Sequence, residues 1–86
     1  MQKLLFFLMP TCPHCKRAEG FLAELCEEDA RYRAIPIERV DETRETERAE
    51  QYDYFYVPCF FLGDEKLHEG AVTREAVRAV LDRALA

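Results

Sequence analysis

The stretch Pro10-Thr11-Cys12-Pro13-His14-Cys15 (PTCPHC) decides the fold, because two regular patterns meet there. Before it, Lys3 to Met9 (KLLFFLM) is a nearly continuous apolar run, which is typical of a strand covered on both faces. After it, from Pro13 to about Glu28, apolar residues recur at i, i+3, i+4, i+7 and i+8, as on one face of a helix. Proline suits the first helical position, where its missing N–H would be unpaired. The sequence therefore predicts a strand that turns into a helix beginning at Cys12.

The middle of the chain predicts an edge strand and an exposed helix. Tyr32 to Val40 is rich in β-branched residues, and Pro36 inside it lacks the N–H that a central strand needs, so we expect this strand at a sheet edge. Asp41 to Glu50 is nearly all charged, with i,i+3 pairs of opposite sign. We interpret that segment as a solvated helix without a function of its own.

The last third predicts a hairpin and a final helix. Pro58 to Leu62 (PCFFL) has the pattern of a buried strand, and Gly63-Asp64 is a turn that leads into the polar strand Lys66 to Glu69. Thr73 is an expected N-cap for the helix that follows. The apolar stripe of this helix consists of Val77, Val80, Leu81, Ala84 and Leu85.

These elements give an α/β fold of one domain, residues 1–86, with the order βαβαββα. We expect a four-stranded mixed sheet, because a strand–helix–strand unit makes a parallel crossover and the hairpin adds antiparallel strands. The most apolar strands, Leu4 to Met9 and Pro58 to Leu62, should be central. Three helices would cover the two faces of the sheet.

Composition excludes several classes of function. With 12 Lys and Arg against 17 Asp and Glu, the net charge is −5 and the basic residues form no block, so we expect no nucleic-acid partner. No apolar run approaches the roughly 18 residues of a membrane span, so no membrane is expected either. The apolar start lacks a small-residue cleavage site, and we interpret the chain as a cytoplasmic monomer that is mature from Met1.

Cys12-Pro13-His14-Cys15 carries the chemistry that the sequence predicts. At the N-cap, the sulfur of Cys12 would face unpaired amides, including that of Cys15, and the positive end of the helix dipole. Both favour a thiolate, so Cys12 is the predicted nucleophile and Cys15 the thiol that resolves its mixed disulfide. The residues expected to tune the thiolate are Pro13, His14, Lys16 and Arg17.

Two other interpretations of the cysteines remain open. A metal-binding module could hold zinc through Cys12 and Cys15, or an iron–sulfur cluster shared across a dimer, although a structural zinc site needs a second ligand pair. Alternatively, the chain could be a redox-silent domain that binds partners. Cys26 lies on the apolar helix stripe and Cys59 in a buried strand, so we expect both in the core, while His68 should be solvated. An alternative for Cys59, which follows Pro58 directly, is a place close to Cys12 as a third thiol.

The whole chain resembles the thioredoxin superfamily in its small, glutaredoxin-like form. The stretch Pro10 to Cys15 resembles the glutaredoxin active site, with His14 in place of the usual tyrosine. Val57-Pro58 matches the Val-Pro of the family, whose proline is cis and faces the dithiol. The resemblance implies a thioredoxin-like fold and a substrate disulfide that pairs with the backbone of Val57. The substrate-positioning residues that it implies are Pro58, Val57, Thr11, His14, Tyr56 and Gly70.

The sequence departs from the family pattern mainly at the glutathione site. Met9 stands where glutaredoxins carry a lysine, and Glu69-Gly70-Ala71-Val72 has one glycine and no aspartate. Tyr56 replaces a threonine of glutaredoxins, and Thr11 and Phe6 replace the tryptophan and buried aspartate of thioredoxins. We therefore predict a thiol–disulfide oxidoreductase for protein disulfides, with no bound cofactor beyond its own Cys12–Cys15 disulfide. Its external reductant would be glutathione or, more in keeping with these departures, a flavoprotein reductase.

Overall fold

The computed structural model describes all residues from 1 to 86 and contains one four-stranded sheet. The strands are β1 (Leu4–Leu8), β2 (Ile37–Asp41), β3 (Cys59–Leu62) and β4 (Glu65–Glu69). Their order across the sheet is β2-β1-β3-β4; β1 runs parallel to β2 and antiparallel to β3, and β3 runs antiparallel to β4. The mixed sheet is thus confirmed, with the two most apolar strands in the centre and the polar strands at the edges.

The structure has four helices, so the prediction of three was wrong. They are α1 (Pro13–Glu28), α2 (Ala30–Arg33), α3 (Thr46–Glu50) and α4 (Arg74–Leu85). None of them has the length and apolar character that crossing a bilayer requires.

The additional helix, α2, begins because Asp29 interrupts α1. The backbone of Asp29 is extended, and its carboxylate accepts a hydrogen bond from the amide of Arg31 at 2.9 Å, which caps a new helix. Tyr32 is therefore helical, and the strand predicted from Tyr32 begins only at Ile37. Pro36 precedes that strand and does not lie inside it, although β2 is an edge strand as expected.

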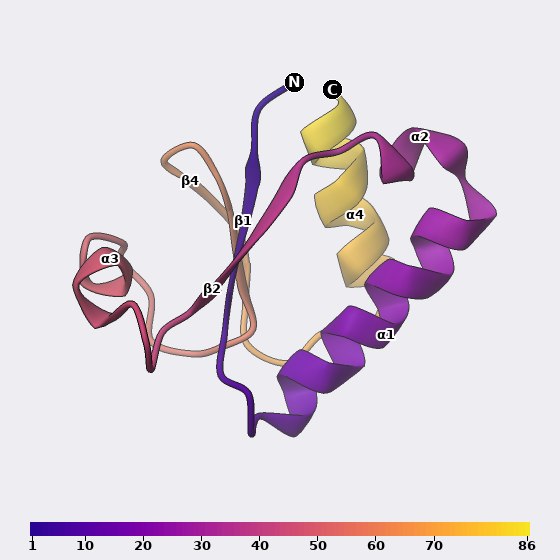
Figure 1. Cartoon of the computed structure of the whole chain (residues 1–86). Coiled ribbons are helices and arrows are strands. Elements are labelled where there is room, and N and C mark those ends of the chain that lie inside the picture. Colours follow the sequence, from indigo (N-terminus) through magenta and orange to yellow (C-terminus); the bar gives the residue numbers. More distant parts are fainter.

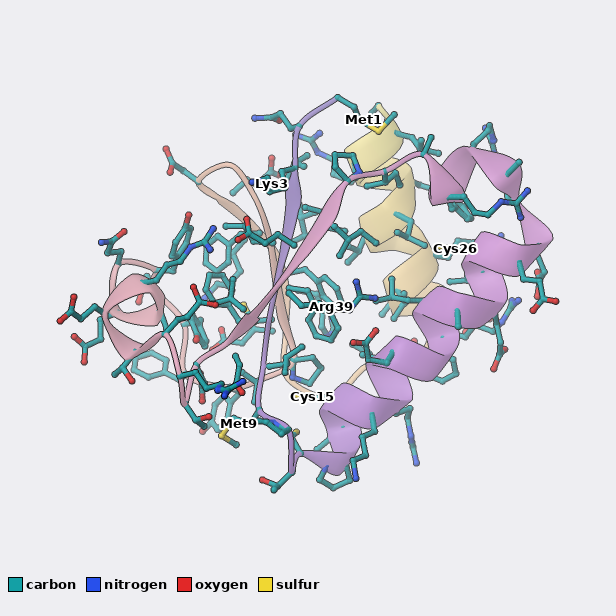
Figure 2. All side chains as sticks on the ribbon, in the orientation of Figure 1. Met1, Lys3, Met9, Cys15, Cys26 and Arg39 are labelled. Atoms are coloured by element: carbon teal, nitrogen blue, oxygen red, sulfur yellow. The ribbon has the colours of Figure 1, made fainter.

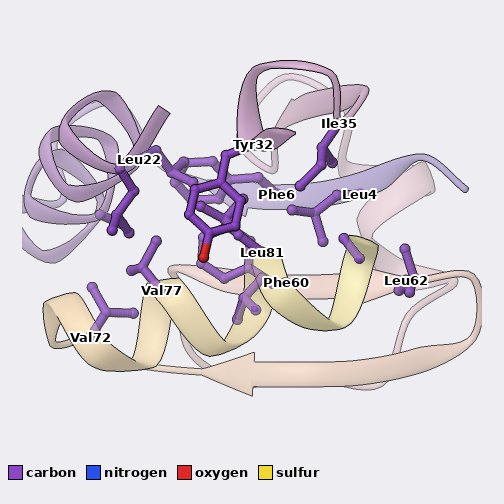
Figure 3. Close-up of a cluster of buried hydrophobic side chains, with 14 residues drawn as sticks. Leu4, Phe6, Leu22, Tyr32, Ile35, Phe60, Leu62, Val72, Val77 and Leu81 are labelled. Carbon is purple, nitrogen blue, oxygen red and sulfur yellow. The ribbon is translucent and has the colours of Figure 1, made fainter. Parts of the chain in front are cut away.

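Helices cover both faces of the sheet, as Figure 1 shows: α1, α2 and α4 lie on one side and α3 on the other. Alternate residues of β1 supply both cores. Leu4 and Phe6 belong to a large cluster with α1, α2 and α4, while Leu5 and Phe7 belong to a smaller cluster with Ala49 of α3. Figure 3 shows the large cluster. The sheet is therefore held between two layers of side chains.

The topology brings three chain turns to one end of the sheet. Because β1 and β3 are antiparallel, the end of β1 lies beside the start of β3, with Phe7 opposite Cys59. Cys59 in turn pairs with Glu69 at the end of β4. The residues after β1, before β3 and after β4 are consequently neighbours.

An ion pair joins the sheet to α1. On the face of the sheet that α1 covers, Arg39 of β2 reaches toward α1 (Figure 2). Its guanidinium donates to both carboxylate oxygens of Glu19, at 2.7 and 2.8 Å.

Candidate active site

Cys12 occupies the N-cap of α1, as the sequence predicts. Its backbone is extended, its carbonyl accepts from the amide of Lys16, and Pro13 takes the first helical position. The amide of Cys15 donates a hydrogen bond to the Cys12 sulfur at 3.3 Å. An amide and the positive end of a 16-residue helix therefore converge on one sulfur atom, which is an arrangement that stabilises negative charge.

Cys15 is the more deeply buried of the two thiols. It exposes 3% of its surface, against 8% for Cys12, and both are free thiols in this structure. Burial raises the pKa of the Cys15 thiol from 9.0 to about 12. Figure 2 shows Cys15 beside Met9, where β1 passes into α1. Cys15 and Met9 also line a cavity of about 150 Å³. The two thiols thus have different environments: one is held at a helix N-terminus and the other is kept protonated.

The turn before β3 faces Cys12. The Val57-Pro58 peptide bond is cis, as the resemblance implied, and Pro58 is buried. The carbonyl oxygen of Val57 lies 3.9 Å from the sulfur of Cys12, while its amide has no acceptor within the chain. A backbone donor therefore remains available beside the dithiol.

Gly70, which follows β4, holds the turn before β3 through a backbone hydrogen bond. Its amide donates to the carbonyl of Pro58 at 2.9 Å, and its φ of +91° is a left-handed value that favours glycine. A β-carbon at Gly70 would lie 4.0 Å from that of Tyr56. The structure therefore brings together Cys12, Cys15, Tyr56, Val57, Pro58 and Gly70 from three separate parts of the chain.

The remaining predicted site residues lie around the dithiol without holding it in place. These residues, all exposed and without side-chain hydrogen bonds within the chain, are Thr11, Pro13, His14, Lys16 and Arg17. Charges on such exposed side chains are strongly screened by solvent. The backbone amide of Cys15 is therefore the fixed donor to the Cys12 sulfur, and the side-chain charges stay predicted modulators.

Sequence reasoning missed the residues that hold the loop ahead of Val57. One carboxylate oxygen of Glu69 accepts from the amides of Phe55 and Tyr56, the latter at 2.9 Å. The other accepts from the ammonium of Lys66 at 2.8 Å, which also donates to the carbonyl of Asp53 at 3.0 Å. The Lys66 ammonium and the two amides lower the pKa of Glu69 to about 2. No local pattern could have indicated this contact, because it joins segments 13 and 14 residues apart.

The other two cysteines and the second histidine are buried or half-buried. Cys59 is completely buried, as expected, whereas Cys26 is half-buried against the large cluster. His68 was expected to be solvated but is half-buried, with Nε2 2.9 Å from the carbonyl oxygen of Ala71. Nowhere do three or more His, Cys, Asp or Glu side chains gather as a metal-ligand set, so a metal held by Cys12 and Cys15 would need ligands from a second molecule.

Sequence comparisons relate nearly the whole chain to known proteins. A family model described as thioredoxin matches residues 1–84. A thioredoxin from Methanocaldococcus jannaschii is 26% identical over 83 residues, which is 96% of this chain and 95% of that protein. The similarity therefore extends across nearly the whole length of both chains.

Structural comparisons find the same architecture in solved structures. Oxidised thioredoxin from Plasmodium falciparum superimposes with a TM-score of 0.73 at 18% identity, covering 98% of this chain and 81% of that one. The germline-specific thioredoxin Deadhead from Drosophila melanogaster gives a TM-score of 0.68 at 18% identity, covering 94% and 78%. At this identity the likeness concerns the fold, which is an α/β thioredoxin-like fold with a four-stranded mixed sheet and four helices.

Proposed function

Because this chain belongs to the thioredoxin family, we propose that it is a thiol–disulfide oxidoreductase that reduces disulfide bonds in other proteins through Cys12 and Cys15. Family membership supports thiol–disulfide chemistry in general. The observation that carries the dithiol route is the position of the Cys12 sulfur, 3.3 Å from the amide of Cys15 and 3.9 Å from the carbonyl oxygen of Val57.

In the first step, the Cys12 thiolate attacks one sulfur of the substrate disulfide. The Cys12–substrate disulfide forms, the substrate S–S bond breaks, and the departing substrate thiolate takes up a proton. The unpaired amide of Val57 is a donor for the substrate backbone next to that disulfide. Pro58, held by Gly70, keeps this donor beside Cys12.

In the second step, the sulfur of Cys15 attacks the sulfur of Cys12 and forms the Cys12–Cys15 disulfide. The second substrate thiolate leaves, so two electrons have passed to the substrate. The high pKa of Cys15, caused by burial, means that its thiol arrives protonated. Its proton passes to the departing thiolate, to solvent or to His14, since Phe6 occupies the position of the family's buried acid.

An external reductant must then return the Cys12–Cys15 disulfide to the dithiol. We propose a flavoprotein reductase as this partner, with glutathione as the alternative donor. Met9 supports this choice, because it offers no charge for a glutathione carboxylate where glutaredoxins carry a lysine. We propose that the protein works as a monomer in a reducing, cytoplasmic setting, with the dithiol as its only redox group.

Substitution of each cysteine tests the proposal directly. In an insulin reduction assay with dithiothreitol as the electron source, Cys12→Ser should abolish catalysis, because it removes the attacking sulfur. When the reduced protein is mixed with insulin in the absence of dithiothreitol, Cys15→Ser should instead accumulate mixed disulfides between Cys12 and the substrate, detectable by mass spectrometry. Cys26→Ser is the matched control, because this half-buried cysteine lies away from the site along α1 (Figure 2). Full activity in Cys12→Ser would refute the proposal.

A further inference from the structure

Two aromatic side chains in the segment that leads to Val57 are unusually exposed. Phe55 is 84% exposed and Tyr56 is 70% exposed, whereas most other large apolar side chains are packed into the two cores. Both directly precede Val57, whose carbonyl faces Cys12 and whose amide is unpaired. Exposed aromatic side chains next to a functional site are characteristic of surfaces that bind other proteins.

The backbone beneath these two side chains is firmly held. The carboxylate of Glu69 accepts hydrogen bonds from the amides of both residues. The ammonium of Lys66 donates to the same carboxylate and to the carbonyl of Asp53. Hydrogen bonds to an ionised acceptor are stronger than those between neutral groups. The aromatic side chains are thus presented on a preformed segment, and a partner need not order it on binding.

We infer that Glu69 is a positioning residue that holds Phe55 and Tyr56 as a docking surface for an apolar polypeptide segment flanking the substrate disulfide. The inference rests on the proposed function and deepens it by naming the residue that positions the segment in front of Val57. An apolar polypeptide segment fits this surface, because the surface is aromatic and is followed directly in the chain by the unpaired amide of Val57. A small disulfide without flanking polypeptide offers no apolar segment that could contact Phe55 and Tyr56.

The test compares a protein disulfide with a small one. The reduced protein is mixed with insulin or with hydroxyethyl disulfide, and the second-order rate of Cys12 oxidation is measured for each. In Glu69→Ala, the rate with insulin should fall about tenfold, because binding must then order the segment. The rate with hydroxyethyl disulfide should fall less than about twofold. Glu69→Gln keeps an acceptor oxygen and should recover part of the insulin rate.

Two further variants keep the test decisive. Phe55→Ser combined with Tyr56→Ser changes only exposed side chains and should reproduce the selective loss with insulin. Glu65→Ala is the control, because it removes an exposed ion pair, to Arg83, at the other end of the same strand. Equal losses with both disulfides, or no loss with insulin in either variant, would overturn the inference. A wild-type protein that reduces neither disulfide would instead refute the proposed function itself.

Discussion

Cys59 and Cys15 are both buried thiols, and burial raises the pKa of each to about 12. Only Cys15 has a second cysteine beside it, so only Cys15 has a redox role in our proposal. Cys59 lies in β3 opposite Phe7 of β1 and belongs to the smaller core cluster, together with Phe61. The charge of Glu69 contributes further to the high pKa of Cys59. In our proposal the raised pKa of Cys59 therefore affects only the stability of the protein and not its redox reaction.

The thiol of Cys59 should make the reduced protein sensitive to alkali. Between pH 9 and pH 12 the folded state keeps a proton that the unfolded state loses, so the free energy of unfolding falls as pH rises, by up to about 1.4 kcal/mol per pH unit. Below pH 9 the contribution of the protonated Cys59 thiol to the free energy of unfolding is fully present. Cys59→Ala lacks it and should cost about 1 kcal/mol at pH 7 through the lost buried sulfur.

Urea unfolding of both proteins under reducing conditions, from pH 7 to pH 10.5, measures this effect. The stability difference between wild type and Cys59→Ala should narrow above pH 9 and change sign before pH 10.5, because the loss of about 1.4 kcal/mol per pH unit then exceeds the initial difference of about 1 kcal/mol. Every other titrating group is common to the two proteins and cancels in the comparison. A difference that stays constant over the whole range would contradict a raised pKa for Cys59.

At the level of the elements, the sequence predicts regular segments well and their ends less well. Helical periodicity predicts the apolar stripe of α4, and continuous apolar runs predict the buried strands β1 and β3. Both patterns report burial directly. The segment from Tyr32 was predicted as strand, because a capping contact of Asp29 with Arg31 is invisible to a pattern of apolar residues. The Glu69 contact to the loop before Val57 was missed for a similar reason, since it depends on tertiary packing.

The start of α4 offers a quantitative test of a predicted cap. The hydroxyl of Thr73 accepts a hydrogen bond from the amide of Ala76 at 3.1 Å, and the backbone of Thr73 is extended, as at an N-cap. Thr73→Ala should lower the free energy of unfolding by about 1 kcal/mol, whereas Thr73→Ser should keep most of it. Urea unfolding at pH 7 measures both. Equal losses in the two variants would show that the hydroxyl does not act as a cap.

At the scale of the whole molecule, the same two central strands form the cores and position the residues of the candidate site. β1 supplies both cores and ends at Leu8, shortly before Cys12, and β3 begins just after Pro58. Packing between these strands therefore sets the distance between the dithiol and Val57. The rings of Phe6 and Phe60 stack across the two strands with centroids 4.6 Å apart (Figure 3). Tyr32, also in this cluster, donates from its hydroxyl to Asp82 of α4 and so links α2 to α4.

Phe6 also occupies the place where the resemblance locates a buried acid, and Phe6→Asp tests whether this core could accept one. The site is fully buried against Phe60 and offers a carboxylate no partner. Truncating a buried phenylalanine costs about 3–5 kcal/mol, and an unpaired buried carboxyl adds to that cost. Phe6→Asp should therefore lose most of the stability of an 86-residue domain.

Phe6→Leu, which keeps the position apolar, should cost about 1–1.5 kcal/mol and is the matched control. Circular dichroism and urea unfolding at pH 7 distinguish the two outcomes. If Phe6→Asp folded with an unchanged midpoint and reduced insulin faster, the core would tolerate an acid and our account of Cys15 would be wrong. The expected collapse would show that the core around Phe60 does not accept a carboxylate at this position of β1.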